Sequence, residues 1–153
     1  MYDSYFTVDF EMGKIVVYTG PGEEILGVDF DLEDRVRTRP SGCHAARLFA
    51  AYFRGEKLQL DLDADLTWES AFRQKVYARV RNIPSGQTLA YGEIAAQAGS
   101  PGGGRAVGQA MAANRFPLII PCHRVISGNG GIGGFSSDIG LKKYLLRLEG
   151  AVF

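Results

Sequence analysis

Residues 91–113 read YGEIAAQAGSPGGGRAVGQAMAA, and this stretch decides the fold of the second half of the chain. Its pattern predicts a short helix over 91–98, a turn at 100–102 and a second helix over 104–113. Two short helices joined by a tight, glycine-containing turn have the layout of a helix-turn-helix. The sequence therefore predicts this motif at the centre of the second half.

Further elements flank this motif on both sides. Before it, Thr67 is a predicted N-cap, and the apolar side chains that follow share one helical face, namely Trp68, Phe72, Val76 and Val80. After it come a buried extended run over 116–120, a glycine-rich loop over 128–134 and a last helix over 138–149.

The first half has a different pattern. Three runs rich in β-forming residues, at 5–10, 14–18 and 25–31, are separated by short turn sequences and predict a small antiparallel sheet. Apolar residues at helical spacing over 41–55 predict one helix that covers this sheet. An acidic connector over 61–65 then leads into the second half.

Composition places the chain among ordinary globular proteins. Of its 153 residues, 46% are apolar and 22% charged, and no apolar run approaches the roughly 18 residues of a membrane span. The acidic start at 1–4 lacks the basic and apolar regions of a secretory signal, so we expect an intracellular protein with reduced thiols at its two cysteines.

The zero net charge conceals an asymmetry. Residues 1–66 carry 7 Lys/Arg and 13 Asp/Glu, a net of −6, whereas residues 67–153 carry 10 and 4, a net of +6. A basic second half suggests an anionic partner such as nucleic acid, although an acidic domain can also simply neutralise its neighbour.

Reactive side chains gather at Cys122-His123-Arg124, directly after an apolar run. Burying such groups is costly unless they have partners or a chemical role, and an adjacent histidine and arginine can lower a thiol pKa. Cys122 is therefore a candidate thiolate nucleophile. Neighbours on an extended strand point to opposite faces, so His123 could reach the sulfur only through a local turn or a bridging water.

Glu149 lies in the last turn of the predicted final helix, where a negative charge opposes the helix dipole, while Lys142, Lys143 and Arg147 complement it. Two interpretations remain open. Glu149 is either a solvated helix-end residue or a carboxylate turned inward to orient His123.

The second helix of the helix-turn-helix suggests how nucleic acid would bind. With Val107, Ala110 and Met111 facing inward, the exposed face is left with small groups and one long cation, Arg105. Such a face offers few contacts to base edges in the major groove but suits a narrow minor groove and a side chain inserted into the base stack. Because a nucleophile cannot reach a base inside a duplex, base extrusion is the natural hypothesis.

Several motifs are rejected. The G-x-G-x-x-G match at 128–133 lacks a following parallel strand and an acidic ribose ligand, and the glycines at 102–104 lack the Gly-Lys-Ser/Thr of a P-loop. The acidic connector lacks the glycine and distal glutamate of a calcium loop. Cys43-His44 repeats the residue types of Cys122-His123 but has small or apolar neighbours on a helix, so we assign it no function.

The chain resembles the O6-alkylguanine-DNA alkyltransferases. The resemblance is strong over about 67–150, highly specific at Pro-Cys-His-Arg-Val, and limited to layout over 1–66. The motifs that carry it are Ile83-Pro84-Ser85-Gly86, Tyr91, Arg105-Ala106-Val107-Gly108, Asn114, Ile120-Pro121-Cys122-His123-Arg124-Val125-Ile126 and Leu148-Glu149-Gly150.

This resemblance implies a role for each matching residue in the reaction. Cys122 would accept the alkyl group from the O6 position of a flipped guanine, with His123 as its base through a water. Glu149 would orient His123, Tyr91 would crowd the phosphate or donate a proton towards the guanine, and Asn114 would hold the turn that carries Cys122.

The resemblance also implies DNA and pocket residues. Arg105 would fill the gap left in the duplex, next to Ala106 and Gly108 on the DNA-binding helix and with Tyr91 at the phosphate. The substrate pocket would be lined by Met111, Val125, Phe135 and Ser136, the last near the guanine oxygen. Four residues depart from the family pattern. Ala90 stands where a capping hydroxyl is frequent, Gly103-Gly104 replace alanines, and Phe135 stands where many members have tyrosine.

We therefore expect an α/β (α+β) protein of two domains. Residues 1–66 would form a support domain with a small antiparallel sheet and a helix in a ribonuclease-H-like layout. Residues 67–153 would form a mostly helical, winged-helix-like domain that binds DNA and transfers the alkyl group. The expected protein is a monomer, cytoplasmic or nuclear according to the host, with no cofactor, no metal and no membrane contact.

The expected activity is that of a methylated-DNA–protein-cysteine S-methyltransferase. Each molecule would react once, on O6-alkylguanine in double-stranded DNA bound through its minor groove and possibly on O4-alkylthymine. The alternative is an alkyltransferase-like protein that binds lesions without transfer, against which the presence of Cys122 argues. A plain helix-turn-helix regulator would need polar base-reading residues on its second helix, and these are absent.

Overall fold

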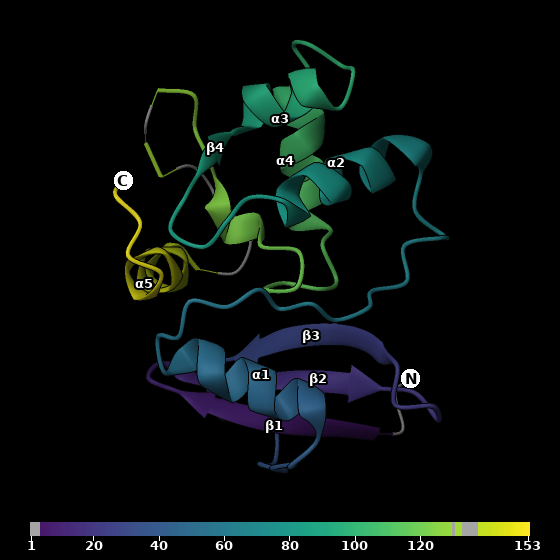
Figure 1. The fold of residues 1–153 in the computed structure, drawn as a ribbon, viewed down its shortest axis with the longest axis vertical. Helices are drawn as coiled ribbons and strands as arrows, with labels where there is room; N and C mark the ends of the chain where they lie inside the picture. Colours follow the sequence, from purple (N-terminus) through teal and green to yellow (C-terminus); the bar gives the residue numbers. More distant parts are fainter. Residues whose placement is uncertain (1–3, 130, 133–137) are drawn as a thin grey trace. The chain divides into compact units, whose positions relative to one another are not determined.

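A computed structural model describes residues 4–129, 131–132 and 138–153 (Figure 1). The chain divides into two compact units. The first comprises Met1–Asp65 together with Arg115–Ile119, and the second comprises Leu66–Asn114 together with Ile120–Phe153. Arg115–Ile119, which the sequence places in the second half, thus joins the first unit.

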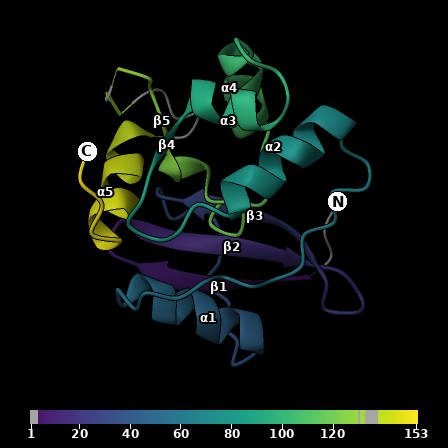
Figure 2. The ribbon, with the colours of Figure 1, turned by 45° about the horizontal axis from the view of Figure 1, so that its top comes forward.

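The first unit is a three-stranded antiparallel sheet with one helix. The strands are β1 (Ser4–Phe10), β2 (Gly13–Thr19) and β3 (Ile25–Asp31), in the order β1-β2-β3. Helix α1 (His44–Phe53) lies across one face of this sheet, as Figure 2 shows, and its Phe53 ring stacks on Phe10 with ring centroids 4.5 Å apart. The sheet and its covering helix confirm the sequence prediction for this half.

The second unit is mostly helical. Helices α2 (Ala71–Arg81), α3 (Tyr91–Gln97) and α4 (Gly104–Ala112) pack together, and α5 (Ile139–Leu148) packs against the 3₁₀ turn η1 (Cys122–Arg124). Two-residue strands β4 (Leu89–Ala90) and β5 (Val125–Ile126) pair in parallel. The α3–α4 pair confirms the predicted helix-turn-helix, and the glycines of its turn, Gly99 and Gly102, have φ near +80°.

Two predictions about the elements are wrong. Helix α2 begins at Ala71 with Ser70 as its N-cap, so Trp68 lies outside the helix and is 53% exposed. A serine hydroxyl that accepts from the Arg73 amide satisfies an orphan donor, and this favours the later start over one at Thr67.

The segment 116–120 is buried but not extended, because Leu118 has φ +73° and turns the backbone. Its neighbour Arg115 hydrogen-bonds to the third strand of the first unit, through its carbonyl to the Val28 amide at 2.9 Å and its guanidinium to the Leu26 carbonyl at 3.0 Å. These bonds to β3 outweigh the apolar run that predicted an extended segment.

Over the residues that the structure describes, no helix combines the length and apolar character needed to cross a membrane.

Candidate functional site

Cys122 opens the 3₁₀ turn η1, which is the local turn that the sequence left open. Its amide donates to the Ile120 carbonyl at 2.7 Å, and the Arg124 amide donates to the Pro121 carbonyl at 2.9 Å. The Asn114 side-chain amide donates to the same Ile120 carbonyl at 2.9 Å. Asn114 therefore hydrogen-bonds to the segment that leads into Cys122.

A buried charge cluster lies behind this turn. Glu149 Oε2 is 2.7 Å from His123 Nε2, and both side chains are 1% exposed. The inward orientation of Glu149, rather than the solvated one, is thus present. Because an ionised carboxylate only accepts, the Nε2 proton must lie on His123, which leaves Nδ1 as the basic ring nitrogen.

Arg124 completes the cluster, and the sequence analysis gave it no defined role there. Its guanidinium donates to both Glu149 oxygens, with Nε 2.9 Å from Oε1 and Nη2 2.8 Å from Oε2, while Nη1 donates to the Ile83 carbonyl at 2.6 Å. A planar fork that matches a carboxylate in this bidentate way is specific to arginine. Only the adjacency of Arg124 to His123 in the sequence pointed to this contact.

The turn at 83–86 is shaped to receive this cluster. Gly86 has φ +87°, and a Cβ at this position would lie 3.1 Å from the Glu149 carbonyl oxygen. The backbone conformation therefore favours glycine, and the close approach of the end of α5 makes a larger residue tighter still.

The pKa directions follow from burial and these contacts. Burial raises the pKa of the Cys122 thiol, while the side-chain hydrogen bond of Asn114 and the charge of Lys142 lower it. Burial lowers the pKa of His123 against the opposing effect of Glu149. At Glu149 burial acts to raise the pKa, but the hydrogen bonds from His123 and Arg124 outweigh it and hold the pKa well below its ordinary value. The resting pair is thus a neutral imidazole and a carboxylate, and Cys122 rests as a thiol whose ionisation needs help.

A cavity of about 690 Å³ opens beside Cys122 within the second unit. Its walls come from helices α3 and α4, the start of η1 and the loop after β5; they are formed by Tyr91, Gly104, Arg105, Gly108, Gln109, Met111, Ala112, Cys122, Ser127 and Gly128. Among the residues expected to line a pocket, Met111 does so, whereas Val125 is buried and is not among the lining residues. Phe135 and Ser136 lie outside the described residues.

Helix α4 presents the slim face that its sequence suggests. Val107, Ala110 and Met111 are buried, and Arg105 and Ala106 are exposed. Apart from its chain neighbours and the nearby backbone of α4, no heavy atom of the described residues lies within 4 Å of where a Cβ on Gly108 would stand, so this glycine leaves space beside the cavity. The structure brings Tyr91, Arg105 and Cys122 to the walls of one cavity.

Tyr91 is the first residue of α3 and is half-buried, and burial raises the pKa of its phenol. Ala90 before it offers no side-chain cap. Glu93 Oε2 accepts the Ala90 amide at 2.8 Å, which is the half of a capping box that does not need a hydroxyl at position 90.

Lys142 is a site residue that sequence reasoning missed. It lies on α5 with 0% exposure, and its Nζ donates to the Val125 carbonyl at 2.6 Å. Burial lowers the pKa of Lys142 to about 8, and the charge of Cys122 acts in the opposite direction. A lysine within a helix is ordinary, so no signal in the sequence separated Lys142 from Lys143.

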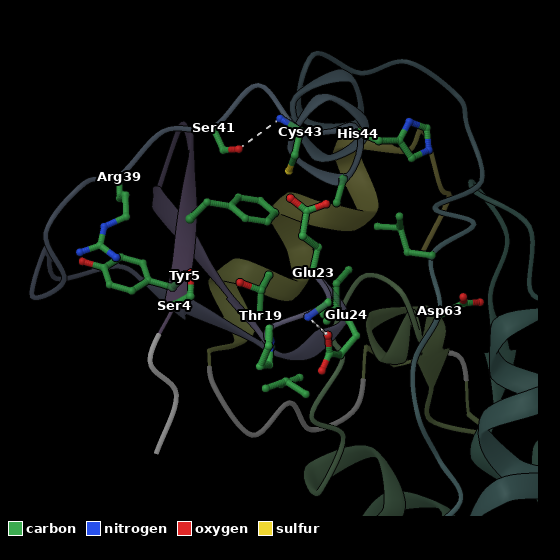
Figure 3. Close-up of a pocket in the computed structure, with 18 of the residues that line it drawn as sticks. Ser4, Tyr5, Thr19, Glu23, Glu24, Arg39, Ser41, Cys43, His44 and Asp63 are labelled. Atoms are coloured by element: carbon green, nitrogen blue, oxygen red, sulfur yellow. Dashed lines mark hydrogen bonds between the residues drawn. The ribbon is translucent and has the colours of Figure 1, made fainter.

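Cys43 and His44 are placed differently. The Cys43 sulfur caps α1 by accepting the Ala46 amide at 3.4 Å, and Figure 3 shows the His44 ring pointing away from it. Both residues line a cavity of about 980 Å³ within the first unit. Among the described residues, no group of three or more His, Cys, Asp or Glu side chains is placed to hold a metal ion.

Comparisons with known proteins agree with this site. Residues 71–151 match the family described as 6-O-methylguanine DNA methyltransferase, DNA binding domain. A methylated-DNA–protein-cysteine methyltransferase of Salmonella typhimurium is 38% identical over 131 residues, which are 84% of this chain and 75% of that protein. A DNA base-flipping protein of Thermus thermophilus is 48% identical over 104 residues, 67% of this chain and 69% of that one.

Among solved structures, that of Mycobacterium tuberculosis OGT in complex with DNA is similar over 95% of this chain and 92% of that chain, with 38% identity and a TM-score of 0.82. The family match spans more than half of the chain and includes Cys122, His123 and Glu149. From the matched domain, the curated relatives and the shared fold, the chain belongs to the 6-O-methylguanine DNA methyltransferase family.

Proposed function

We propose that this protein repairs alkylated DNA by transferring the alkyl group from the O6 atom of guanine to the sulfur of its own Cys122. The observation that carries this proposal is the position of Cys122, at the wall of the cavity beside α4 and one residue from the His123–Glu149 pair. The names of the relatives, which describe a methyltransferase acting on DNA and a protein cysteine, support it.

The chemical step needs a thiolate and an activated leaving group. The proton of the Cys122 thiol passes through a water to Nδ1 of His123, since Nε2 is engaged with Glu149. The sulfur then attacks the alkyl carbon in line, an S–C bond forms, and the C–O6 bond breaks with its electrons moving to the guanine. The Tyr91 phenol, which is protonated at neutral pH, donates a proton to the leaving base and takes one back from solvent.

The product is a thioether, whose new S–C bond does not break readily because the thiolate would be a poor leaving group. Each molecule therefore reacts once, and the proposed step includes no cofactor. Because sulfur attacks the carbon of any small alkyl group in the same way, O4-alkylthymine is a second candidate substrate for the same cavity.

The proposed DNA contact is through the minor groove. The small residues on α4 allow this helix to approach a narrow groove, and exposed Arg105 beside the cavity is placed to fill the gap that an extruded guanine leaves. The net charge of +6 on residues 67–153 supports binding to phosphates. We propose a monomer that acts where the DNA is, in the cytoplasm of a host without a nucleus or in the nucleus of one with it.

Intact mass after incubation with a duplex that carries one O6-methylguanine tests the transfer. We expect the mass to rise by about 14 Da, one methyl in place of one hydrogen, and peptide mapping to place this group on Cys122. Cys43→Ser is the matched control, because a serine at the N-cap keeps the cap of α1 and should leave transfer unchanged. Transfer that survives Cys122→Ser would refute the proposal.

Base extrusion is tested with two substrates. Arg105→Ala should slow repair in duplex DNA far more than reaction with free O6-benzylguanine, because only the duplex requires unstacking. Arg79→Ala, which removes an exposed arginine from α2, controls for the loss of one positive charge. Equal losses of Arg105→Ala on both substrates would show that Arg105 maintains the fold or the cavity instead.

A lesion-binding protein without transfer activity is the second candidate function. The 48% identity to a DNA base-flipping protein favours it, as does the burial that raises the pKa of the Cys122 thiol. In that case the wild-type protein would bind the O6-methylguanine duplex more tightly than undamaged DNA, and its mass would not change.

A further inference from the structure

Lys142 is a buried charge that the proposed transfer reaction does not use. Its side chain is 0% exposed, in the interior of the second unit, and α5 would lose nothing as a helix with an apolar residue at this position. Taking an ammonium out of water is expensive, and here burial lowers the pKa of Lys142 to about 8. The desolvation cost of the Lys142 ammonium indicates that this charge has a local role.

The backbone of Val125 links this ammonium to the nucleophile. The Val125 amide donates to the Cys122 carbonyl at the end of η1, and the Val125 carbonyl accepts from Lys142 Nζ at 2.6 Å. The same Nζ lies 5.8 Å from the centre of the Tyr91 ring, which forms part of the cavity wall with Cys122. Lys142 therefore reaches the wall of the cavity from behind, next to the turn that carries the sulfur.

Lys142 and Cys122 also interact electrostatically, and each shifts the pKa of the other. The charge of Lys142 lowers the pKa of Cys122, and the charge of Cys122 raises that of Lys142. Arg124 cannot take over this role fully, because both Glu149 oxygens already bind its guanidinium. Other titratable side chains also interact with Cys122, Lys142 or His123, and they include Tyr77 of α2, Tyr91 of α3, Arg124 of η1 and Glu149 at the end of α5.

We propose that the ammonium of Lys142 is the resident positive charge that stabilises the Cys122 thiolate, independently of the His123–Glu149 pair. Lys142 is thus a positioning residue that keeps its own proton throughout the reaction. The proton that leaves the sulfur passes to His123 and on to solvent, because Lys142 and Arg124 both disfavour the imidazolium.

This inference deepens the proposed function, and it can be tested without DNA. The rate at which iodoacetamide alkylates Cys122, followed by mass from pH 6 to 10 in a Cys43→Ser background, reports thiolate formation whether or not the protein repairs DNA. Lys142→Gln removes the charge but keeps a donor for the Val125 carbonyl, so it is the first variant. Lys143→Gln makes the same change on the next residue of α5, which is only half-buried, and is the matched control.

We expect Lys142→Gln to lower the alkylation rate about tenfold near neutral pH, the effect of raising the apparent thiol pKa by about one unit. The difference from wild type should narrow above pH 8, where Lys142 itself loses its proton. Lys143→Gln should follow the wild-type profile, and Lys142→Arg, which keeps the charge, should recover part of the rate.

Folding is checked by near-UV circular dichroism. Lys142→Met, which leaves no buried donor or charge, serves if the glutamine variant does not fold, since apolar replacements of buried charges are often tolerated. A folded variant with the wild-type alkylation profile would overturn the role of Lys142. If iodoacetamide alkylates Cys122 of the wild-type protein as expected but the protein takes no methyl group from DNA, the proposed function is overturned and the inference about Lys142 stands.

Discussion

Glu149→Gln is the most informative single change, because the carboxylate accepts three charged hydrogen bonds from two buried side chains. A glutamine amide would keep one acceptor oxygen and turn an NH2 group towards the donors of Arg124 and His123. Removing one partner of a buried ion pair costs about 3–5 kcal/mol, mostly because the other charge stays buried without compensation. Against a total stability of roughly 5–15 kcal/mol for a typical domain, this is a large loss.

Urea unfolding of the intact protein measures this loss. Trp68 is the only tryptophan and lies in the second unit, so its fluorescence reports on the unit that contains Glu149. The midpoint should fall with an unchanged m-value, and Arg124→Met/Glu149→Gln should be less destabilised than the sum of the two single variants. Glu56→Gln, which removes the charge of an exposed pair with Arg54, should leave the midpoint nearly unchanged.

The pH dependence of the free energy of unfolding tests the same interaction, and its direction follows from the pKa shifts. The native contacts hold the pKa of Glu149 below its ordinary value of 4.5, so its stabilisation is present above pH 4.5 and is lost as the pH falls below it. His123 acts over a higher range, because its lowered pKa means that the unfolded chain takes up a proton first below pH 6.5. Glu149→Gln should lose the acid-dependent step near and below pH 4.5. A midpoint shift worth less than about 1 kcal/mol, with that step intact, would refute the role assigned to the carboxylate.

Three further variants test the packing around the site and the sheet. Asp138→Ala removes the N-cap of α5, whose carboxylate accepts the Leu141 amide at 2.9 Å, and should cost about 1 kcal/mol in urea unfolding, whereas Asp138→Ser should cost less. Tyr77→Phe deletes the buried hydrogen bond from the phenol to the Ala110 carbonyl at 2.7 Å. It should lower the free energy of unfolding by about 1–3 kcal/mol, measured by urea unfolding. Glu23→Gly relieves a left-handed backbone at φ +64° on the exposed turn after β2 and should raise the thermal midpoint slightly, while a lower midpoint would show that the side chain compensates for the strain.

The elements that could be predicted from the sequence are those whose reasons are local. The α3–α4 turn follows from glycines that adopt positive φ, and the sheet of the first unit follows from short alternating runs between turn residues. The predictions for the start of α2 and the path of residues 116–120 were wrong for a different reason. Each feature depends on contacts made only in the folded protein. These are the Ser70 hydroxyl cap in one case and the two hydrogen bonds between Arg115 and β3 in the other.

The residues of the candidate site also fall into those that could be identified from the sequence and those that could not. Cys122, His123 and Glu149 could be selected because a reactive pair after an apolar run and a carboxylate at an unfavourable helix position are visible in the sequence. Arg124 and Lys142 could not be ranked in advance, because their roles depend on which carboxylate and which carbonyl they meet. The resemblance to the alkyltransferases named motif positions such as Gly86, but the reason for this glycine is the carbonyl of Glu149, more than 60 residues away in the chain.

The burial of Cys122 has two opposite consequences for its proposed role as an acceptor that reacts once. It raises the pKa of the thiol, which protects the sulfur from electrophiles in solution while no substrate is bound. Burial also removes water from around the sulfur. Once the thiol proton has left, the charge of Lys142 and the dipole of Asn114 therefore act on the sulfur with little screening. A solvent-exposed thiolate would react faster with every small electrophile and would be consumed before it met DNA. In the proposed reaction the nucleophile is consumed, so a protonated thiol within a preassembled electrostatic site favours selectivity over speed.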